Sequence, residues 1–151
     1  MKNTKDESFM HAALGEARRA LEEKEVPIGA VVVCLDTVLS RAHNRTIRLN
    51  DPSAHAEILA IREACQMRKN HRIPDCELYV TIEPCAMCLG AAVQARLKRI
   101  VFGTLDPKGG AVRSIMQFPV EKTNHNLNIE GGILANECGL IMKEFFATKR
   151  K

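Results

Sequence analysis

The stretch LYVTIEPCAMC, residues 78–88, decides the fold class because it contains a strand, a sharp break and the start of a helix. Residues 78–82 are β-branched, aromatic or leucine, which is typical of a short strand. Glu83-Pro84-Cys85 interrupts that strand, and an apolar helix is expected over residues 86–95. Residues 99–103 predict another strand. Strand, helix and strand in this order indicate a βαβ unit with parallel strands.

The half of the chain before this unit also divides into helices and strands. Residues 8–23 carry apolar side chains at helical spacing and predict a first helix. Residues 28–33 and 38–40 predict a hairpin of two strands. Asp51-Pro52-Ser53 is a helix-start signal, so a second helix is expected over residues 54–66.

The C-terminal part predicts fewer elements. Residues 106–110 indicate a loop, residues 129–132 a turn, and residues 133–146 a last amphipathic helix. No internal repeat or linker interrupts the pattern. We therefore expect one α/β domain over residues 1–151.

The composition is that of a globular protein. The chain has 151 residues, 46% hydrophobic and 26% charged, which is enough apolar surface for a core. No apolar run approaches the roughly 20 residues of a membrane helix. Residues 1–9 carry charges of both signs in place of an apolar signal segment, so we expect a cytoplasmic protein. The net charge of +4 is weak support for an acidic partner.

Six cysteines are present, and without a secretion signal they favour free thiols or metal ligands over disulfides. Four of them stand outside any motif and are interpreted as small buried hydrophobes or surface thiols. These four are Cys34, Cys65, Cys76 and Cys138. The remaining two belong to the motif at residues 84–88.

One histidine and two cysteines suit a tetrahedral zinc site. His55 lies near the start of the helix after residues 51–53, and Cys85 and Cys88 lie three residues apart at the next helix start. A helix N-terminus favours thiolates, the form of cysteine that binds metal. Three protein ligands leave a fourth position open for water, as in catalytic zinc sites, where the metal lowers the pKa of that water.

Glu57 follows His55 by two residues and is predicted to be the general acid and base for such a water. Each segment alone has a plainer interpretation. His55 and Glu57 suit a solvated helix start, and Cys85 and Cys88 suit a buried pair or half of a structural zinc site. Together they favour a hydrolytic deaminase, because H-x-E followed by P-C-x-x-C is the signature of zinc nucleobase deaminases.

The sequence resembles the bacterial tRNA-specific adenosine deaminases, within the cytidine and deoxycytidylate deaminase superfamily, over nearly its whole length. The similar segments are residues 25–30, 43–44, 51–58, 78–88, 101–103, 106, 108, 132–138 and 145–146. The resemblance implies a three-layer α/β/α fold of the cytidine deaminase type, with a central mixed sheet of about five strands.

That resemblance also implies an activity. It is the hydrolytic deamination of adenosine to inosine at the wobble position of an arginine tRNA anticodon, on a base flipped out of the RNA loop. It implies one Zn²⁺ per subunit on His55, Cys85 and Cys88, with Glu57 moving protons from water to the base and the leaving ammonia. A homodimer that binds the anticodon stem-loop is expected, with the helix at residues 86–95 as a candidate interface.

Contacts with RNA are implied outside the metal site as well. Asn44 is expected to hydrogen-bond the purine and Ile28 to pack on it, while Asp106 is expected beside a flanking nucleotide. The predicted substrate-binding residues are Glu25, Ile28, Asn44, Ala56, Asp106, Phe146 and Arg150. Plainer interpretations stay open for them, such as turn residues, an inward strand residue and solvated loop carboxylates.

The C-terminus is a further RNA candidate. Its cations suit phosphate contacts, although a basic tail is usually just solvated, and an aromatic side chain there suits a splayed base. Because an aromatic pair at helical spacing more often belongs to the core, we expect at most one of Phe145 and Phe146 to face RNA. The cations are Lys143, Lys149, Arg150 and Lys151. The chain departs from the family at residues 111–114. The family commonly has a small, glycine-containing stretch there, whereas this chain has Ala-Val-Arg-Ser with the bulky Arg113.

Two other functions stay open at this point. The same zinc core suits a deaminase of guanine, cytosine or a nucleoside, and activity on free bases distinguishes that class. A non-catalytic zinc module that binds RNA is the other. Glu57 argues against the second, because a structural metal site has no need of a carboxylate beside an open coordination position.

Overall fold

The computed structural model describes residues 4–149, which form four α-helices, one short 3-10 helix and five strands. In chain order they are α1 (Thr4–Glu22), β1 (Gly29–Cys34), β2 (Thr37–His43), α2 (Ala56–Arg68), β3 (Cys76–Ile82), α3 (Ala86–Gln94), β4 (Arg99–Thr104), η1 (Val120–Lys122), β5 (Asn128–Gly131) and α4 (Ala135–Lys149). Among these residues, no helix is both long and apolar enough to cross a membrane.

The five strands form one mixed sheet in the order β2-β1-β3-β4-β5. β1 runs antiparallel to β2 and β3, whereas β3, β4 and β5 are parallel to one another. The unit β3-α3-β4 therefore confirms the predicted βαβ arrangement, and the predicted mixed sheet of about five strands is confirmed too.

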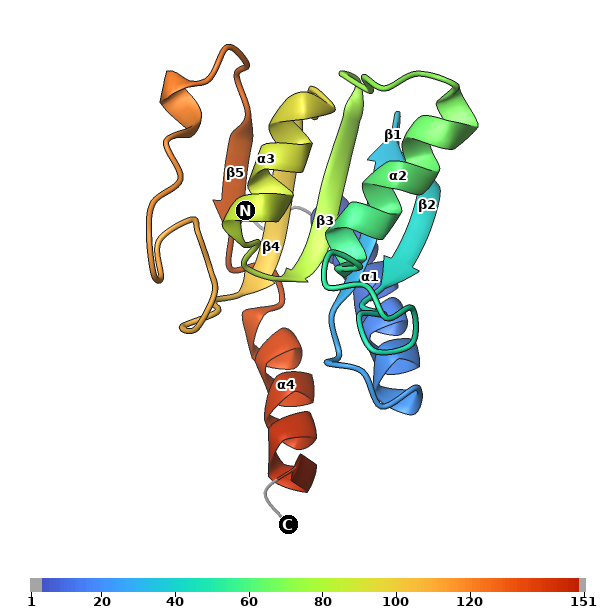
Figure 1. Cartoon of the computed structure of the whole chain (residues 1–151), viewed down its shortest axis with the longest axis vertical. Coiled ribbons are helices and arrows are strands. Elements are labelled where there is room, and N and C mark those ends of the chain that lie inside the picture. The colour runs from blue at the N-terminus through green and yellow to red at the C-terminus, as the bar shows by residue number, and fades with distance from the viewer. Residues whose placement is uncertain (1–3, 150–151) are drawn as a thin grey trace.

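Helices cover both faces of this sheet, which makes the predicted three-layer structure (Figure 1). Every residue of β1 is buried, as expected of a strand covered on both sides. Ala30 and Val32 pack in the core cluster with α2 and α3. Val31 and Val33 pack in the other cluster, with α1 and α4. The alternation follows from the two-residue period of a strand.

The sequence interpretation was wrong about residues 129–132. They were expected to form a turn, but β5 (Asn128–Gly131) pairs with β4 at the edge of the sheet. Three of its four residues are exposed, so the strand has no alternation of apolar and polar side chains that a pattern search can find. The last helix also begins at Ala135 rather than residue 133, after Leu134 turns the backbone with a φ of 54°.

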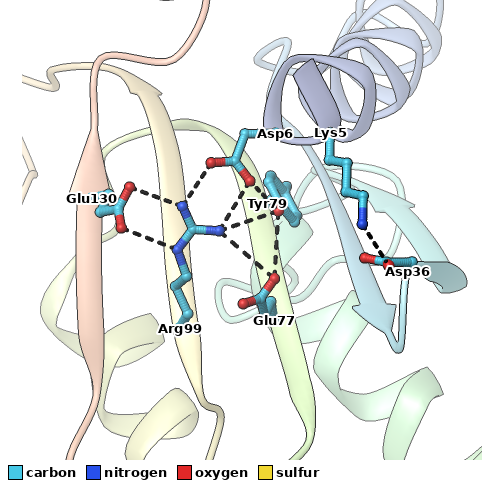
Figure 2. A network of polar contacts seen from close by, with 7 residues as sticks. All are labelled: Lys5, Asp6, Asp36, Glu77, Tyr79, Arg99 and Glu130. Carbon is cyan, nitrogen blue, oxygen red and sulfur yellow. Dashed lines mark hydrogen bonds and ion pairs between the residues drawn. The ribbon is translucent and has the colours of Figure 1, made fainter. Parts of the chain in front are cut away.

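Arg99 fastens α1 to three neighbouring strands (Figure 2). Its Nη2 atom lies 2.6 Å from Asp6 Oδ2 on α1 and 2.8 Å from Glu130 Oε2 on β5, and its Nη1 lies 3.7 Å from Glu77 Oε1 on β3. The hydroxyl of Tyr79 donates to Asp6 Oδ1 over 2.6 Å. Asp6 is only 2% exposed, and the hydrogen bond from Arg99 lowers its pKa. The ion pair thus fixes the position of α1 on the sheet.

Replacing Asp6 by Asn is expected to lower the free energy of unfolding by roughly 3 kcal/mol, because Arg99 loses a buried partner charge. A lowered folded-state pKa means that Asp6 contributes fully above its unfolded pKa of roughly 4, and that the contribution disappears as the pH falls through the folded pKa. Urea unfolding at pH 8, 6.5 and 5 should therefore show a constant difference from the wild type.

The ion pair between Lys5 and Asp36 is the matched control, since both side chains are 66% exposed (Figure 2). Exposed pairs contribute little to stability, so Asp36→Asn should leave the unfolding curve nearly unchanged. An equal loss in both variants, or a difference for Asp6→Asn that shrinks between pH 8 and pH 5, would contradict the assignment.

Candidate functional site

Two helices begin at one edge of the sheet and bring the predicted metal ligands there. α2 has His55 as its N-cap residue and α3 has Cys85. Both residues have an extended backbone, and neither side chain makes a capping hydrogen bond to its own helix. Cys85 follows closely on the carboxyl end of β3, the edge at which open α/β sheets bind ligands.

The three predicted ligand atoms form a nearly equilateral triangle. His55 Nδ1 lies 3.7 Å from Cys85 Sγ and 3.6 Å from Cys88 Sγ, and the two sulfur atoms are 3.6 Å apart. A tetrahedral zinc ion with ordinary bond lengths separates such ligands by roughly 3.5 to 3.8 Å. The donor set and its spacing therefore fit a zinc ion.

The electrostatics of these groups also suit a cation. The hydrogen bond with Cys88, helped by His55, lowers the pKa of Cys85 to about 4. The same hydrogen bond raises the pKa of Cys88, and Cys85 raises the pKa of His55. One thiolate is thus formed at neutral pH beside the N-terminus of α3, where the helix dipole also favours negative charge.

Glu57 is the second residue of α2 and is 3% exposed. Burial raises its pKa to about 7, although the charge of His55 and a hydrogen bond with Cys88 act in the opposite direction. A carboxyl group with such a pKa can both accept and release a proton near neutrality.

Three of the predicted substrate residues lie around the start of β1 and of α2. The backbone N–H of Asn44 donates to the carbonyl of Ile28 over 3.0 Å, so the two residues are neighbours. Asn44 is 5% exposed and Ile28 is half-buried. The methyl group of Ala56 is fully enclosed by the core.

Glu25 is buried, with 1% of its surface exposed, and is not a solvated loop carboxylate. Its two oxygens accept hydrogen bonds from the backbone N–H groups of Ile47 (3.2 Å) and Arg48 (2.7 Å). The carboxylate therefore holds the loop between β2 and α2, which carries Asn44 at its start. A direct contact between Glu25 and substrate stays a prediction.

A groove of about 740 Å³ lies between the loop after β4 and the helix α4. Ile28 lies just before β1 and Ile82 is the last residue of β3, so the groove lies next to the strand ends that lead to the candidate metal site. Its lining residues are Val26, Ile28, Ile82, Thr104, Leu105, Asp106, Pro107, Lys108, Gly139, Met142, Lys143, Phe146, Ala147 and Lys149. The lining thus combines apolar side chains with three lysines and one aspartate.

The two phenylalanines of α4 differ in their exposure. Phe145 is 6% exposed and belongs to the core side, whereas Phe146 is 39% exposed and lines the groove. The ammonium group of Lys108 lies 5.5 Å from the centre of the Phe146 ring. Arg150, the remaining predicted contact, lies outside the described residues.

Sequence reasoning missed Glu83, which organises the loop after β4. Its carboxylate accepts hydrogen bonds from the backbone N–H groups of residues 106, 112, 113 and 114, over 2.8 to 3.0 Å, and from the Ser114 hydroxyl. Although burial opposes ionisation, these bonds lower the pKa of Glu83 to about 2. The available signal was a charged residue directly before Pro84-Cys85. Arg113 is exposed, and only its backbone joins this network.

The fold and this site define a deaminase. The model of the MafB19-like deaminase family matches residues 3–150, and the chain belongs to that family. A tRNA-specific adenosine deaminase from Agrobacterium fabrum (strain C58) is 48% identical over 143 residues, which cover 94% of this chain and 94% of the relative. The resemblance to the tRNA-specific adenosine deaminases is therefore confirmed, and the chain is a member of their family.

Solved structures agree with this assignment. One, from a study of A-to-I editing by tRNA:A34 deaminases at the wobble position of transfer RNA, is 47% identical with a TM-score of 0.85, and the match covers 89% of this chain and 98% of that one. A guanine deaminase from Bacillus subtilis is 36% identical with a TM-score of 0.63, over 70% of this chain and 66% of that one.

The contact between Gly110 and Glu83 gives a test of the loop. A methyl group on Gly110 would overlap the Glu83 carboxylate, so Gly110→Ala has to move the loop or break its hydrogen bonds. We expect the free energy of unfolding to fall by roughly 1 to 3 kcal/mol in urea titrations.

Gly15→Ala is the control, because a methyl group there, on α1, meets no atom within 4 Å. Alanine is a better helix former than glycine, so this variant should be as stable as the wild type or more stable, by up to about 1 kcal/mol. A Gly110→Ala protein as stable as the wild type would show that Glu83 does not constrain the loop.

Proposed function

We propose that this protein deaminates adenosine to inosine at the wobble position of a tRNA anticodon, with an arginine tRNA as substrate. The observation that carries the proposal is the triangle of His55, Cys85 and Cys88 with the buried carboxyl group of Glu57 beside it. It stands in a chain 48% identical to a relative named tRNA-specific adenosine deaminase.

In this proposal His55 Nδ1 and the sulfur atoms of Cys85 and Cys88 hold one zinc ion per chain. When bound, zinc lowers the pKa of a water molecule and so prepares it to attack the ring carbon that carries the amine. Glu57 accepts one proton of that water and delivers it to the ring nitrogen. It then passes the second proton of the same water to the amine, which leaves as ammonia. A pKa of about 7 suits both transfers.

The base binds beside this centre. Asn44 hydrogen-bonds the purine edge, and its backbone bond to Ile28 fixes its position. The half-buried side chain of Ile28 packs on the ring, and the backbone at Ala56 lies between the metal ligand and the acid. Glu25 supports this arrangement by holding the loop that Asn44 begins.

The groove beside α4 suits nucleotides next to the target base. Single-stranded RNA is bound by apolar or aromatic surfaces for the bases and by cations for the phosphates. Phe146 supplies the first, and Lys108, Lys143 and Lys149 supply the second. Asp106 faces the same groove and is the proposed contact with a flanking nucleotide, while Arg150 extends the basic end of the chain.

The active form in this proposal is a homodimer whose subunits share the anticodon stem-loop. The exposed side of α3 supports it, because Met87 there is 41% exposed although the helix is mostly apolar. We also propose that the enzyme acts in the cytoplasm, in keeping with the composition of a globular protein, 46% hydrophobic and 26% charged.

Deamination of free guanine is the second candidate, since a guanine deaminase is 36% identical over 70% of this chain. Both the identity and the coverage are lower than for the tRNA-specific relative. The apolar and cationic groove favours a substrate that is larger than a base, so RNA is preferred.

The first test measures inosine in a transcribed arginine tRNA anticodon stem-loop after incubation with the zinc-loaded protein. Wild type should form inosine, and Glu57→Gln should lower the rate by roughly 10²- to 10⁴-fold because the proton transfers are lost. The zinc content of the variant should stay at the wild-type level, since Glu57 is not a ligand.

Glu63→Gln is the matched control, because Glu63 is an exposed carboxylate on the same helix. It should leave the rate unchanged. Ammonia release from free guanine without inosine formation would favour the second candidate, and full activity of Glu57→Gln would remove Glu57 from the mechanism.

The metal content provides an independent prediction. The purified chain should hold one zinc ion, as measured by plasma emission spectrometry, and a chelator should remove both the zinc and the activity. His55→Ala and Cys88→Ser should lose the ion, because each deletes one corner of the triangle. Cys65→Ser is the control, since Cys65 is not part of the group formed by His55, Cys85 and Cys88. Full zinc content in Cys88→Ser would contradict the ligand assignment.

A further inference from the structure

A second pair of cysteines meets at the opposite end of β1 and β3 from the candidate site. Cys34 and Cys76 are directly opposite each other in the antiparallel register of these strands. Their sulfur atoms are 2.9 Å apart. Opposed residues of antiparallel strands have Cα atoms roughly 4.5 to 5.5 Å apart, which is within the range that a disulfide bridges. A bond between them therefore requires little movement of the backbone.

The surroundings of this pair do not suit a second metal ion, although Asp75 lies within ligand distance. Two sulfur atoms on one tetrahedral zinc ion are roughly 3.8 Å apart, so 2.9 Å is too short. The guanidinium group of Arg68 also occupies the position that a metal cation would need. Arg68 Nη1 lies 2.5 Å from Cys34 Sγ, and Arg68 Nη2 lies 2.9 Å from Asp75 Oδ2.

The two thiols are not equivalent. Cys34 is 8% exposed and borders the hairpin turn at Leu35, which is 82% exposed. Its sulfur lies 2.5 Å from Arg68 Nη1 and 3.2 Å from Asp75 Oδ2. Cys76 is fully buried, which raises its pKa, and its S–H group donates to Cys34. Cys34 is thus placed to react first and Cys76 to react with the product.

We propose that Cys34 and Cys76 are a redox site that forms a reversible disulfide when the protein meets a peroxide. The sulfur of Cys34 attacks one oxygen of hydrogen peroxide and becomes a sulfenic acid, while the thiol proton of Cys34 passes to the other oxygen, which leaves as water. The sulfur of Cys76 then displaces the hydroxyl group from Cys34, and a second water forms. Two thiols and one peroxide give one disulfide and two waters, and a dithiol reverses the bond by exchange.

The bond closes a loop over residues 34–76, which contains β2, α2 and the residues His55 and Glu57. The sulfur pair lies about 20 Å along the strands from the ends that lead to the candidate metal site, given the rise of a strand. The disulfide therefore restrains residues 34–76, which carry His55 and Glu57, and it does not involve Cys85 or Cys88.

The test treats the zinc-loaded, full-length protein with hydrogen peroxide, alkylates free thiols and maps the peptides by mass spectrometry. Trypsin leaves Cys76 in one peptide with Cys85 and Cys88, so a second protease that cuts after Glu77 is needed. We expect a linked pair of peptides carrying Cys34 and Cys76, two hydrogen atoms lighter than the free peptides, that separates with dithiothreitol. The unfolding temperature of the oxidised protein should be several degrees higher than that of the reduced protein.

Variants separate this proposal from its alternatives. Cys34→Ala should abolish the link, Cys65→Ala should keep it, and Arg68→Gln should slow its formation several-fold while the same pair still forms. Alkylated Cys34 after peroxide treatment, or a link from Cys34 to Cys65, would overturn the proposal. A second zinc ion per chain that disappears in Cys34→Ala would also overturn it. Because the link is read from peptide masses, a failure of the tRNA proposal leaves this test intact.

Discussion

The candidate site depends on the meeting of two helix N-termini at one edge of the sheet. α2 and α3 pack side by side over the same face of the sheet, and both begin at the edge where β3 ends (Figure 1). Each N-terminus carries partial positive charge and unpaired N–H groups, so bringing two together is unfavourable unless a negative group lies between them. The thiolate of Cys85 meets this requirement, and its lowered pKa shows that the surroundings favour the charge. The geometry that suits a metal ion thus also offsets the repulsion between the helices.

Two buried carboxylates hold the loops on either side of this edge. Glu25 accepts hydrogen bonds from the backbone of residues 47 and 48, and Glu83 from the backbone of residues 106 and 112–114. Burying a charge is costly unless several donors satisfy it, so each carboxylate specifies one loop conformation strongly. Gly110 shows how closely the second loop approaches, since it has no room for a side chain against Glu83. The walls of the site are therefore fixed by backbone contacts, and their exposed side chains are free to meet a substrate.

The sequence predicted the parts of the fold that have a strong local pattern. The strand at residues 78–82, the break at Pro84 and the helix after it follow from residue types that leave little choice. Cys85 and Cys88 lie at this break and helix start, whereas His55 and Glu57 lie at the start of α2, which Asp51-Pro52-Ser53 predicted. β5 was missed because an exposed edge strand of four residues has no period. The role of Glu83 was missed because its partners come from residues 23 to 31 positions later, and such distant contacts leave no mark in local composition. The family resemblance placed Glu25 among the substrate-binding residues, whereas its hydrogen bonds to residues 47 and 48 show that it holds the loop between β2 and α2.

The two pairs of cysteines show why residue type alone does not assign chemistry. Cys85 and Cys88 are three residues apart on a helix, which separates their sulfur atoms by 3.6 Å, with His55 at the third corner. Cys34 and Cys76 look isolated in the sequence, because only the pairing of β1 with β3 brings their sulfur atoms to 2.9 Å across 42 positions. An open triangle of donors suits a cation, whereas a close pair already beside Arg68 has no room for one. Spacing and neighbouring charge together therefore direct one pair towards metal binding and the other towards oxidation.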